Sequence, residues 1–210
     1  MELALVADRN RNSRLLIVPA LFDEANKLRR LTVEVMRRLD AAGIDCFLPD
    51  LPGSNESLAP LEAQSLEVWR NAVAAAAAHF RATHVLTVRA GALLAPDGLP
   101  GWHYAPVGGA SVLRQLLRAR TIAAREAGRD ETIPDLMALA VSEGLELGGY
   151  RLSAALFAAL SEAVPAAAPG PCIIDQDMLD GPGLWLRAEP DESRTQADAL
   201  AAAVALGITA

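Results

Sequence analysis

The stretch THVLTVRAGALLAP, residues 83–96, has the pattern of a buried strand, a sharp turn and the start of a helix. Many hydrolases place a nucleophilic serine at such a turn, within a G-x-S-x-G pattern, because only small neighbouring residues permit the tight bend. Here Gly91 keeps the last small position, whereas Thr87 replaces the first glycine and Arg89 replaces the serine. A guanidinium is neither a nucleophile nor a base. A register shifted by one residue would bring Ala90 to the turn, and its methyl group is equally inert.

The base of a serine triad is missing as well. A histidine usually follows the last strand and deprotonates the serine, but the sequence has no histidine after His103. Carboxylates that could orient a histidine do occur late in the chain, at Asp175, Asp177 and Asp180. An acid without a nucleophile or a base completes no triad, so two independent losses predict that ordinary acyl hydrolysis does not occur.

Arg89 must then have another role at the carboxyl ends of the predicted strands, where ligands of open parallel sheets bind. A buried charge needs a partner, and we expect Glu24 to be that partner, with Asp50 as the second choice. In one interpretation Arg89 and the backbone amides of Gly91 and Ala92 bind a carboxylate, a sulfate or a sugar acid. In the other, which we favour, an Arg89–Glu24 ion pair fills the former catalytic pocket.

Two further sets of polar and cationic residues lie on predicted helices. The first set, Asn26, Lys27 and Arg30, could face the mouth of the pocket. The second set, Arg114, Arg118 and Arg125, gives its predicted helix a basic stripe. Asn26 could contribute to a ligand site, and the stripe could bind an acidic glycan or protein. We expect instead that the first set is a solvated helix face and that the stripe is ion-paired with nearby carboxylates.

Strand and helix patterns alternate over residues 14–88, which predicts parallel strands joined by helical crossovers. Asp23 is expected to cap the first helix, which Gly43 ends. Further helices are predicted over residues 60–80, 110–128, 132–143 and 153–164, and a last helix is predicted to begin at Ser193. Further strands are expected at residues 101–107, 172–175 and 184–189. The result is one α/β domain over residues 1–210, with a mostly parallel sheet of about six to seven strands and helices on both faces. Residues 108–165 are expected to be an insertion that forms a small helical cap.

Composition excludes several classes of protein. Hydrophobic residues make up 52% and charged residues 21% of the 210 residues, which favours a packed globule. A net charge of −7 argues against nucleic acid as the partner. No apolar stretch is long enough to span a membrane and no signal peptide is evident, so we expect a cytoplasmic protein. Cys46 and Cys172 are expected to be buried free thiols, and neither a metal site nor a cofactor motif is recognised.

Three loops carry a resemblance to known proteins. P-A-L-F-D-E (19–24), D-L-P-G-S-N-E-S (50–57) and V-R-A-G-A (88–92) resemble the oxyanion loop, the loop beside the active site and the nucleophile elbow of α/β-hydrolases. More narrowly, the chain resembles the exosortase A system-associated hydrolases of type 2. The segments that carry this resemblance are F-D-E-A-N-K-L-R-R (22–30), residues 50–57, R-A-G-A-L-L-A (89–95), L-R-Q-L-L-R-A-R (113–120) and G-G-Y-R-L-S-A-A-L (148–156). The resemblance implies an α/β-hydrolase fold and a setting among exopolysaccharide and protein-sorting genes of Gram-negative bacteria.

These observations predict an α/β-hydrolase-like protein that has lost its triad and acts as a binding or accessory factor, with a small anionic or sugar-like ligand. The alternative is a genuine hydrolase of ester-type substrates at a rearranged, non-serine site, where Glu24 and Asp50 would activate water. A third hypothesis is a structural protein that forms a homo-oligomer, or docks on another protein, through its cap.

Overall fold

The chain folds around a six-stranded sheet with the strand order β1-β3-β2-β4-β5-β8. The computed structural model describes residues 2–166 and 171–209. The strands are β1 (Ala4–Ala7), β2 (Arg14–Val18), β3 (Asp45–Pro49), β4 (His84–Val88), β5 (Gly101–Tyr104) and β8 (Cys172–Ile174). Only β1 runs antiparallel to its neighbour. The predicted α/β class and mostly parallel sheet are therefore confirmed.

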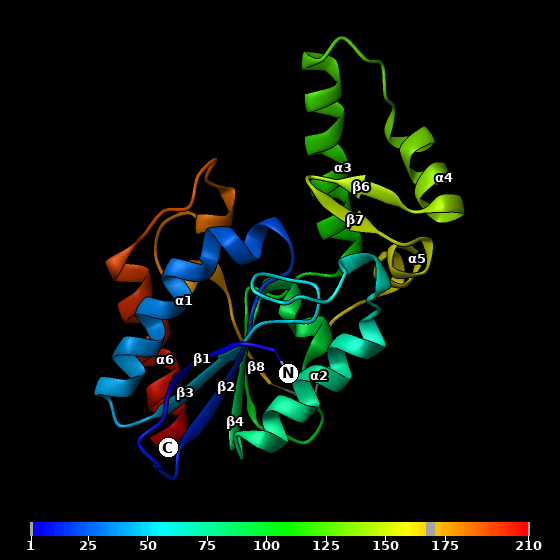
Figure 1. The fold of residues 1–210 in the computed structure, drawn as a ribbon. Coiled ribbons are helices and arrows are strands. Elements are labelled where there is room, and N and C mark those ends of the chain that lie inside the picture. The colour runs from blue at the N-terminus through cyan, green and yellow to red at the C-terminus, as the bar shows by residue number, and fades with distance from the viewer. Residues whose placement is uncertain (1, 167–170, 210) are drawn as a thin grey trace.

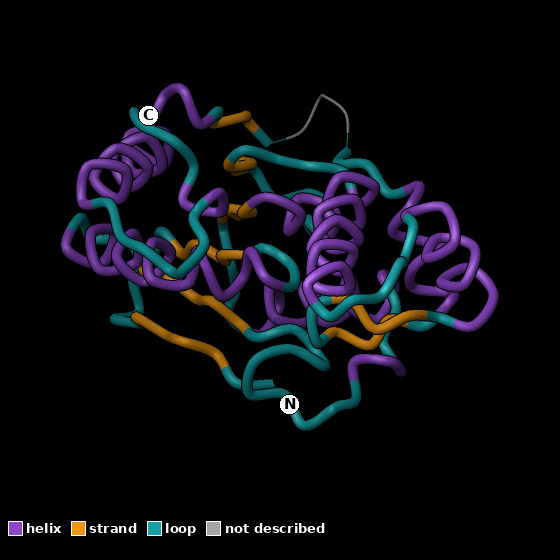
Figure 2. The backbone as a smooth tube through the Cα atoms, turned by 90° about the horizontal axis from the view of Figure 1, so that it is seen from above, coloured by secondary structure: helices purple, strands orange, loops and turns teal. Residues whose placement is uncertain are grey.

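Helices cover both faces of the sheet (Figure 2), which explains why every residue of β2 and β3 is buried. Alternate residues of β2 point to opposite faces. Leu15 and Ile17 join an apolar cluster with α1 (Asp23–Ala41) and α6 (Arg194–Thr209). Leu16 and Val18 join a second cluster, with α2 (Leu66–His79).

Between β5 and β8 the chain forms a helical lobe, residues 109–162, which projects away from the sheet (Figure 1). It contains α3 (Gly109–Glu126), α4 (Ile133–Glu143), α5 (Ala154–Glu162) and a hairpin of β6 (Leu145–Leu147) and β7 (Tyr150–Leu152). Gly148 and Gly149 join the two strands of the hairpin with φ of 58° and 83°, the left-handed pair that a tight two-residue turn requires. The apolar cluster beneath α2 continues into this lobe.

Two of the predicted elements need correction. Residues 184–189 do not form a strand; Leu184–Leu186 is a 3-10 turn, because Trp185 packs inward on Tyr104 with its ring 6.0 Å away. Residues 60–80 are not one helix, since Ser65 caps α2 by accepting a hydrogen bond from the Val68 amide at 3.1 Å. A separate 3-10 turn, residues 61–63, precedes it.

The first helix also begins differently. Phe22, not Asp23, holds the cap position, and Asp23 is the first helical residue, 2.8 Å from Lys27. There its carboxylate stabilises the helix through the positive end of the helix dipole. Gly43 follows the helix end with a φ of 87°, as predicted. None of the helices in the described residues is long and apolar enough to cross a membrane.

The two cysteines differ in environment. Cys46 on β3 is buried as predicted, and burial raises the pKa of its thiol to about 12. Cys172 is exposed, so the prediction for this residue was wrong. The reason is its place at the start of β8, the last strand in the sheet order of the described residues, whose first two residues are both exposed.

Candidate functional site

The turn after β4 keeps the geometry of a nucleophile elbow. Arg89 has a φ of 53°, a left-handed conformation that is uncommon for a long side chain. The small residue two positions on is required by packing: a Cβ on Gly91 would lie 2.4 Å from the Pro19 carbonyl oxygen. The backbone therefore has the shape that presents a side chain at the apex, and the side chain presented is Arg89.

Arg89 is held on all sides. Its Nε and Nη2 donate to the two carboxylate oxygens of Glu24 at 3.0 and 3.1 Å, a bidentate pair. Its Nη1 donates to the Ala105 carbonyl oxygen at 2.9 Å. The guanidinium also lies over the Trp185 ring, 3.9 Å from its centroid. Both charged residues are only 5% exposed, so the predicted Arg89–Glu24 pair fills this position.

The pair leaves little of Arg89 for a ligand. Gly91 and Ala92, the other residues of the predicted anion site, are buried in the same turn. An anion at this place would have to compete with Glu24 for the guanidinium, at the cost of leaving a buried carboxylate unpaired. Anion binding at Arg89 stays a prediction.

Asp50 does not contact Arg89. Its Oδ1 accepts hydrogen bonds from Arg29 Nη1 at 3.1 Å and from Asn55 Nδ2 at 2.8 Å. Its Oδ2 is buried and has no partner in the described residues. The carboxylate therefore ties the loop after β3 to α1, and only one of its oxygens remains uncommitted.

A pocket of about 110 Å³ lies between the start of α1, the loop after β3 and the hairpin of the lobe. It is lined by Phe22 and Asn26 from the start of α1, by Ser54 and Asn55 from the loop after β3, and by Tyr150 from the hairpin of the lobe. Of the residues predicted to bind a ligand, Asn26 reaches the pocket, whereas Arg89, Gly91 and Ala92 do not line it. The 50–57 motif pointed to the loop, but no sequence signal pointed to Tyr150.

His103 is buried on β5, opposite Thr87 of β4. The Thr87 Oγ1 and His103 Nδ1 atoms lie 2.6 Å apart, and His103 Nε2 has no partner in the described part of the chain. Burial lowers the pKa of His103, so the ring is neutral near pH 7. The residue at the apex of the elbow is Arg89, whose side chain carries no hydroxyl or thiol that His103 could deprotonate.

Within the described residues, the late carboxylates of Asp175, Asp177 and Asp180 form no hydrogen bond to a histidine, and the Asp180 side chain accepts one from the Gly181 amide at 2.9 Å. Asp180 has a left-handed φ of 62°, and its carbonyl oxygen accepts a hydrogen bond from Gln196 Nε2 at 2.9 Å. Nearby, Tyr104 donates to the Gln176 side chain at 2.5 Å. These contacts fasten the segment after β8 to β5 and α6. Within the described ranges, no group of three or more His, Cys, Asp or Glu side chains is placed to hold a metal ion.

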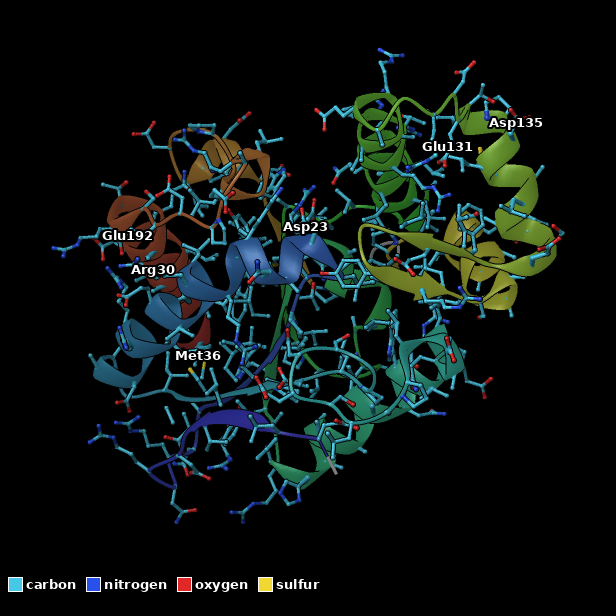
Figure 3. The ribbon with its side chains drawn as sticks, turned by 45° about the horizontal axis from the view of Figure 1, so that its top comes forward. Asp23, Arg30, Met36, Glu131, Asp135 and Glu192 are labelled. Atoms are coloured by element: carbon cyan, nitrogen blue, oxygen red, sulfur yellow. The ribbon has the colours of Figure 1, made fainter. Side chains whose placement is uncertain are left out.

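The helix face near the pocket mouth is solvated and ion-paired. Asn26 is exposed, Lys27 lies 2.8 Å from Asp23, and Arg30 pairs with Glu192 (Figure 3). Lys27 and Arg30 therefore do not line the pocket, and the side-chain amide of Asn26 is the polar group that this helix face contributes to the lining.

The basic stripe on α3 differs from expectation. Arg114, Arg118 and Arg125 are exposed, and none of them forms an ion pair among the residues that the structure describes. The reason is in the sequence, since no Asp or Glu stands three or four residues from any of the three. The arginine that does form a pair is Arg120, at 2.6 Å from Glu131.

No family model and no curated protein matches this sequence. Among solved structures, the chain is similar to a protein from Agrobacterium vitis S4 that is classed as a hydrolase, with a TM-score of 0.57 and 13% identity over 95% of this chain and 90% of that one. Alpha/beta hydrolase domain-containing protein 10 from mouse gives 0.54 and 12% identity, covering 95% and 96%. Est1E from Butyrivibrio proteoclasticus, solved with ferulic acid, gives 0.53 and 14%, covering 82% and 84%. At these identities the likeness concerns the fold alone: the chain has the α/β-hydrolase fold.

Proposed function

We propose that this chain is a non-hydrolytic α/β-hydrolase-fold protein that acts as a binding or accessory factor. The observation that carries the proposal is Arg89, which stands at the elbow and is committed to Glu24, Ala105 and Trp185. A side chain held in this way cannot attack an acyl group, and it occupies the place where a nucleophile would stand.

The alternative, hydrolysis through a carboxylate that activates water, has less support. Glu24 already accepts two charge-assisted hydrogen bonds from Arg89, and both of its oxygens are used. Asp50 keeps one uncommitted oxygen, but this oxygen is buried and the residue does not line the pocket. A general base must come within hydrogen-bond reach of the water that it activates.

The sequence resembles the exosortase A system-associated hydrolases. This resemblance supports an accessory role beside exopolysaccharide or protein-sorting machinery in a bacterial cytoplasm. The helical lobe would serve as the cap, since Tyr150 of its hairpin reaches the pocket. Its exposed arginines, Arg114, Arg118 and Arg125, are where an acidic protein partner would dock.

The test is an assay of the purified chain with short and long p-nitrophenyl esters, a thioester and an anilide, together with a fluorophosphonate probe. An active esterase of the same fold serves as the positive control. We expect neither turnover nor labelling. Turnover that Asp50→Asn or Glu24→Gln abolishes, while circular dichroism shows the variant still folded, would overturn the proposal. So would labelling of any side chain by the probe.

A further inference from the structure

The pocket at the start of α1 is assembled from three separate parts of the chain. Asn26 comes from the first turns of α1, Ser54 and Asn55 from the loop after β3, and Tyr150 from the hairpin of the lobe. Its volume of about 110 Å³ is small beside the roughly 300 Å³ at which drug-sized sites begin, so it suits a molecule of one ring or less.

Among the described residues, no charged side chain lines this pocket. Two carboxylates act on the lining residues: Asp50 is hydrogen-bonded to Asn55 at 2.8 Å, and Asp23 adds to the effect of burial, which raises the pKa of Tyr150. Each carboxylate has a cation, Arg29 and Lys27, but neither cation lines the pocket. An anionic ligand would therefore be desolvated without a cation to pair with.

Most side-chain polar groups of the lining have no hydrogen-bond partner among the described residues. In the ranges 2–166 and 171–209, no group is hydrogen-bonded to the side-chain amide of Asn26 or to the hydroxyls of Ser54 and Tyr150. The side-chain amide of Asn55 donates one hydrogen bond to Asp50, and its side-chain carbonyl oxygen can still accept one. Burial, together with the carboxylate of Asp23, raises the pKa of Tyr150, so its hydroxyl stays protonated. Amide and hydroxyl groups can both donate to and accept from a ligand hydroxyl.

Backbone strain gathers around the same pocket. Phe22 and Asn55 have φ of 55° and 50°, and Gly53 has a φ of 80°. Such conformations are strained in residues other than glycine, and they concentrate at ligand clamps and active sites. Phe22 is held there by edge-on contacts with Tyr150 at 5.3 Å and Trp69 at 6.0 Å. The lining is thus preformed, with an aromatic wall beside the polar groups.

We infer that this pocket binds a neutral molecule rich in hydroxyl groups, a polyol or a single sugar ring, and not an anion. The inference rests on the proposed binding role and narrows its ligand. Apolar CH faces of such a molecule pack on Phe22 and Tyr150, while its hydroxyls bond to Asn26, Ser54 and Tyr150.

The experiment is a titration of the full ¹⁵N-labelled chain, followed by amide chemical shifts. The probes are D-glucose, D-galactose, D-mannose and myo-inositol, each sugar compared at equal ionic strength with a uronate, D-glucuronate or D-galacturonate. At least one neutral probe should give saturable shifts centred on Phe22, Asn26 and Asn55. The uronates should bind at least about tenfold more weakly, because their charge has no partner in the pocket.

Variants locate the binding. Ala25→Leu places a larger side chain at the pocket wall and should abolish the shifts, whereas Ala119→Leu, the same change at an exposed position of α3, should leave them unchanged. Tyr150→Phe keeps the ring but removes a hydroxyl, and should weaken binding about 3- to 10-fold.

Three results would overturn the inference. The first is the absence of saturable shifts with every neutral probe. The second is a uronate that binds as tightly as its sugar, with shifts centred on Arg89 and the Trp185 indole. The third is binding that Ala25→Leu leaves intact. The ester assay is a separate measurement, so a chain that binds glucose but also hydrolyses esters would refute the proposed function and leave this inference standing.

Discussion

Arg89 combines two features that are each costly, a left-handed φ and a guanidinium in the interior. Both are tolerated because the surroundings are built for them. Glu24 supplies a bidentate acceptor, Ala105 a carbonyl oxygen and Trp185 an aromatic face. The pair is therefore a structural element of the turn after β4, and removing one partner should lower the stability of the fold.

Glu24→Ala should lower the free energy of unfolding by about 3–5 kcal/mol, because it leaves Arg89 buried and unpaired. The double variant Glu24→Leu with Arg89→Met replaces both charges by apolar groups of similar size and should remain much closer to the wild type. Urea unfolding followed by circular dichroism measures both. A loss below about 1 kcal/mol in Glu24→Ala would mean that the pair does not hold Arg89, since exposed ion pairs contribute no more than this.

His103 should make stability depend on pH. Burial lowers its pKa in the folded chain, whereas the unfolded chain keeps the ordinary value near 6.5. As the pH falls below this value the unfolded state takes up a proton that the folded state does not, so stability is greatest above it and is lost toward lower pH. Urea midpoints measured from about pH 7.5 to about pH 5.5 should decline in the wild type.

The matched variant for this prediction is His103→Leu with Thr87→Val, which removes both members of the hydrogen-bonded pair. Its decline with pH should be shallower than that of the wild type. Burial also lowers the pKa of His84, though this ring lies near the surface, so His84→Gln is measured in parallel. An unchanged slope in the Thr87/His103 variant would show that His103 does not carry the effect.

The Arg89–Glu24 pair could be predicted from sequence because it follows from topology. β2 and β4 are parallel neighbours, and the two residues come soon after the carboxyl ends of these strands. Trp185 and Tyr150 could not be placed in the same way. Each residue lies on a segment whose position depends on long-range packing. A local sequence pattern does not predict that position.

At the scale of elements, prediction succeeded where the signal was local. The apolar runs of β2 and β3 and the helix between them were recognised because both faces of a parallel sheet are covered, which leaves uninterrupted apolar strands. Residues 184–189 also read as an apolar strand. Their apolar side chains serve a different purpose, since Trp185 and Leu184 turn inward against the sheet and α1 while Leu186 is 69% exposed.

The loop after β3 is an element whose shape depends on one carboxylate. Asp50 bonds to Asn55 within the loop and to Arg29 on α1, and Ser57 accepts a hydrogen bond from the Gly53 amide at 2.9 Å. Asp50→Ala should therefore speed amide exchange over residues 51–57 and cost about 1–3 kcal/mol of stability. Hydrogen-exchange mass spectrometry measures the first effect.

The control for the loop is Glu56→Ala, a change at an exposed residue of the same loop whose side chain forms no ion pair in the described residues. It should leave exchange and stability within about 0.5 kcal/mol of the wild type. If Asp50→Ala behaves like this control, the loop is held by its backbone turns rather than by the carboxylate.

The sheet and the helical lobe are joined through one of the two apolar clusters. Val85 on β4, Trp69 on α2, Leu147 on β6 and Phe157 on α5 belong to the same group of buried residues, so the sheet and the helical lobe share a core. A shared core predicts that the two parts unfold together. The chain offers a convenient probe, because all three tryptophans, Trp69, Trp102 and Trp185, lie outside residues 109–162.

Phe157→Ala tests this coupling from within the lobe. The side chain is 1% exposed, so the truncation should cost about 3–5 kcal/mol. If sheet and lobe unfold together, tryptophan fluorescence, which reports the sheet, must shift to lower urea concentration by the same amount as circular dichroism, which reports all the helices. Met137→Ala, at a side chain that is 45% exposed on α4, should shift neither midpoint by more than the equivalent of about 0.5 kcal/mol. A fluorescence midpoint that stays at the wild-type value while the circular dichroism transition splits in two would show that the lobe unfolds independently of the sheet.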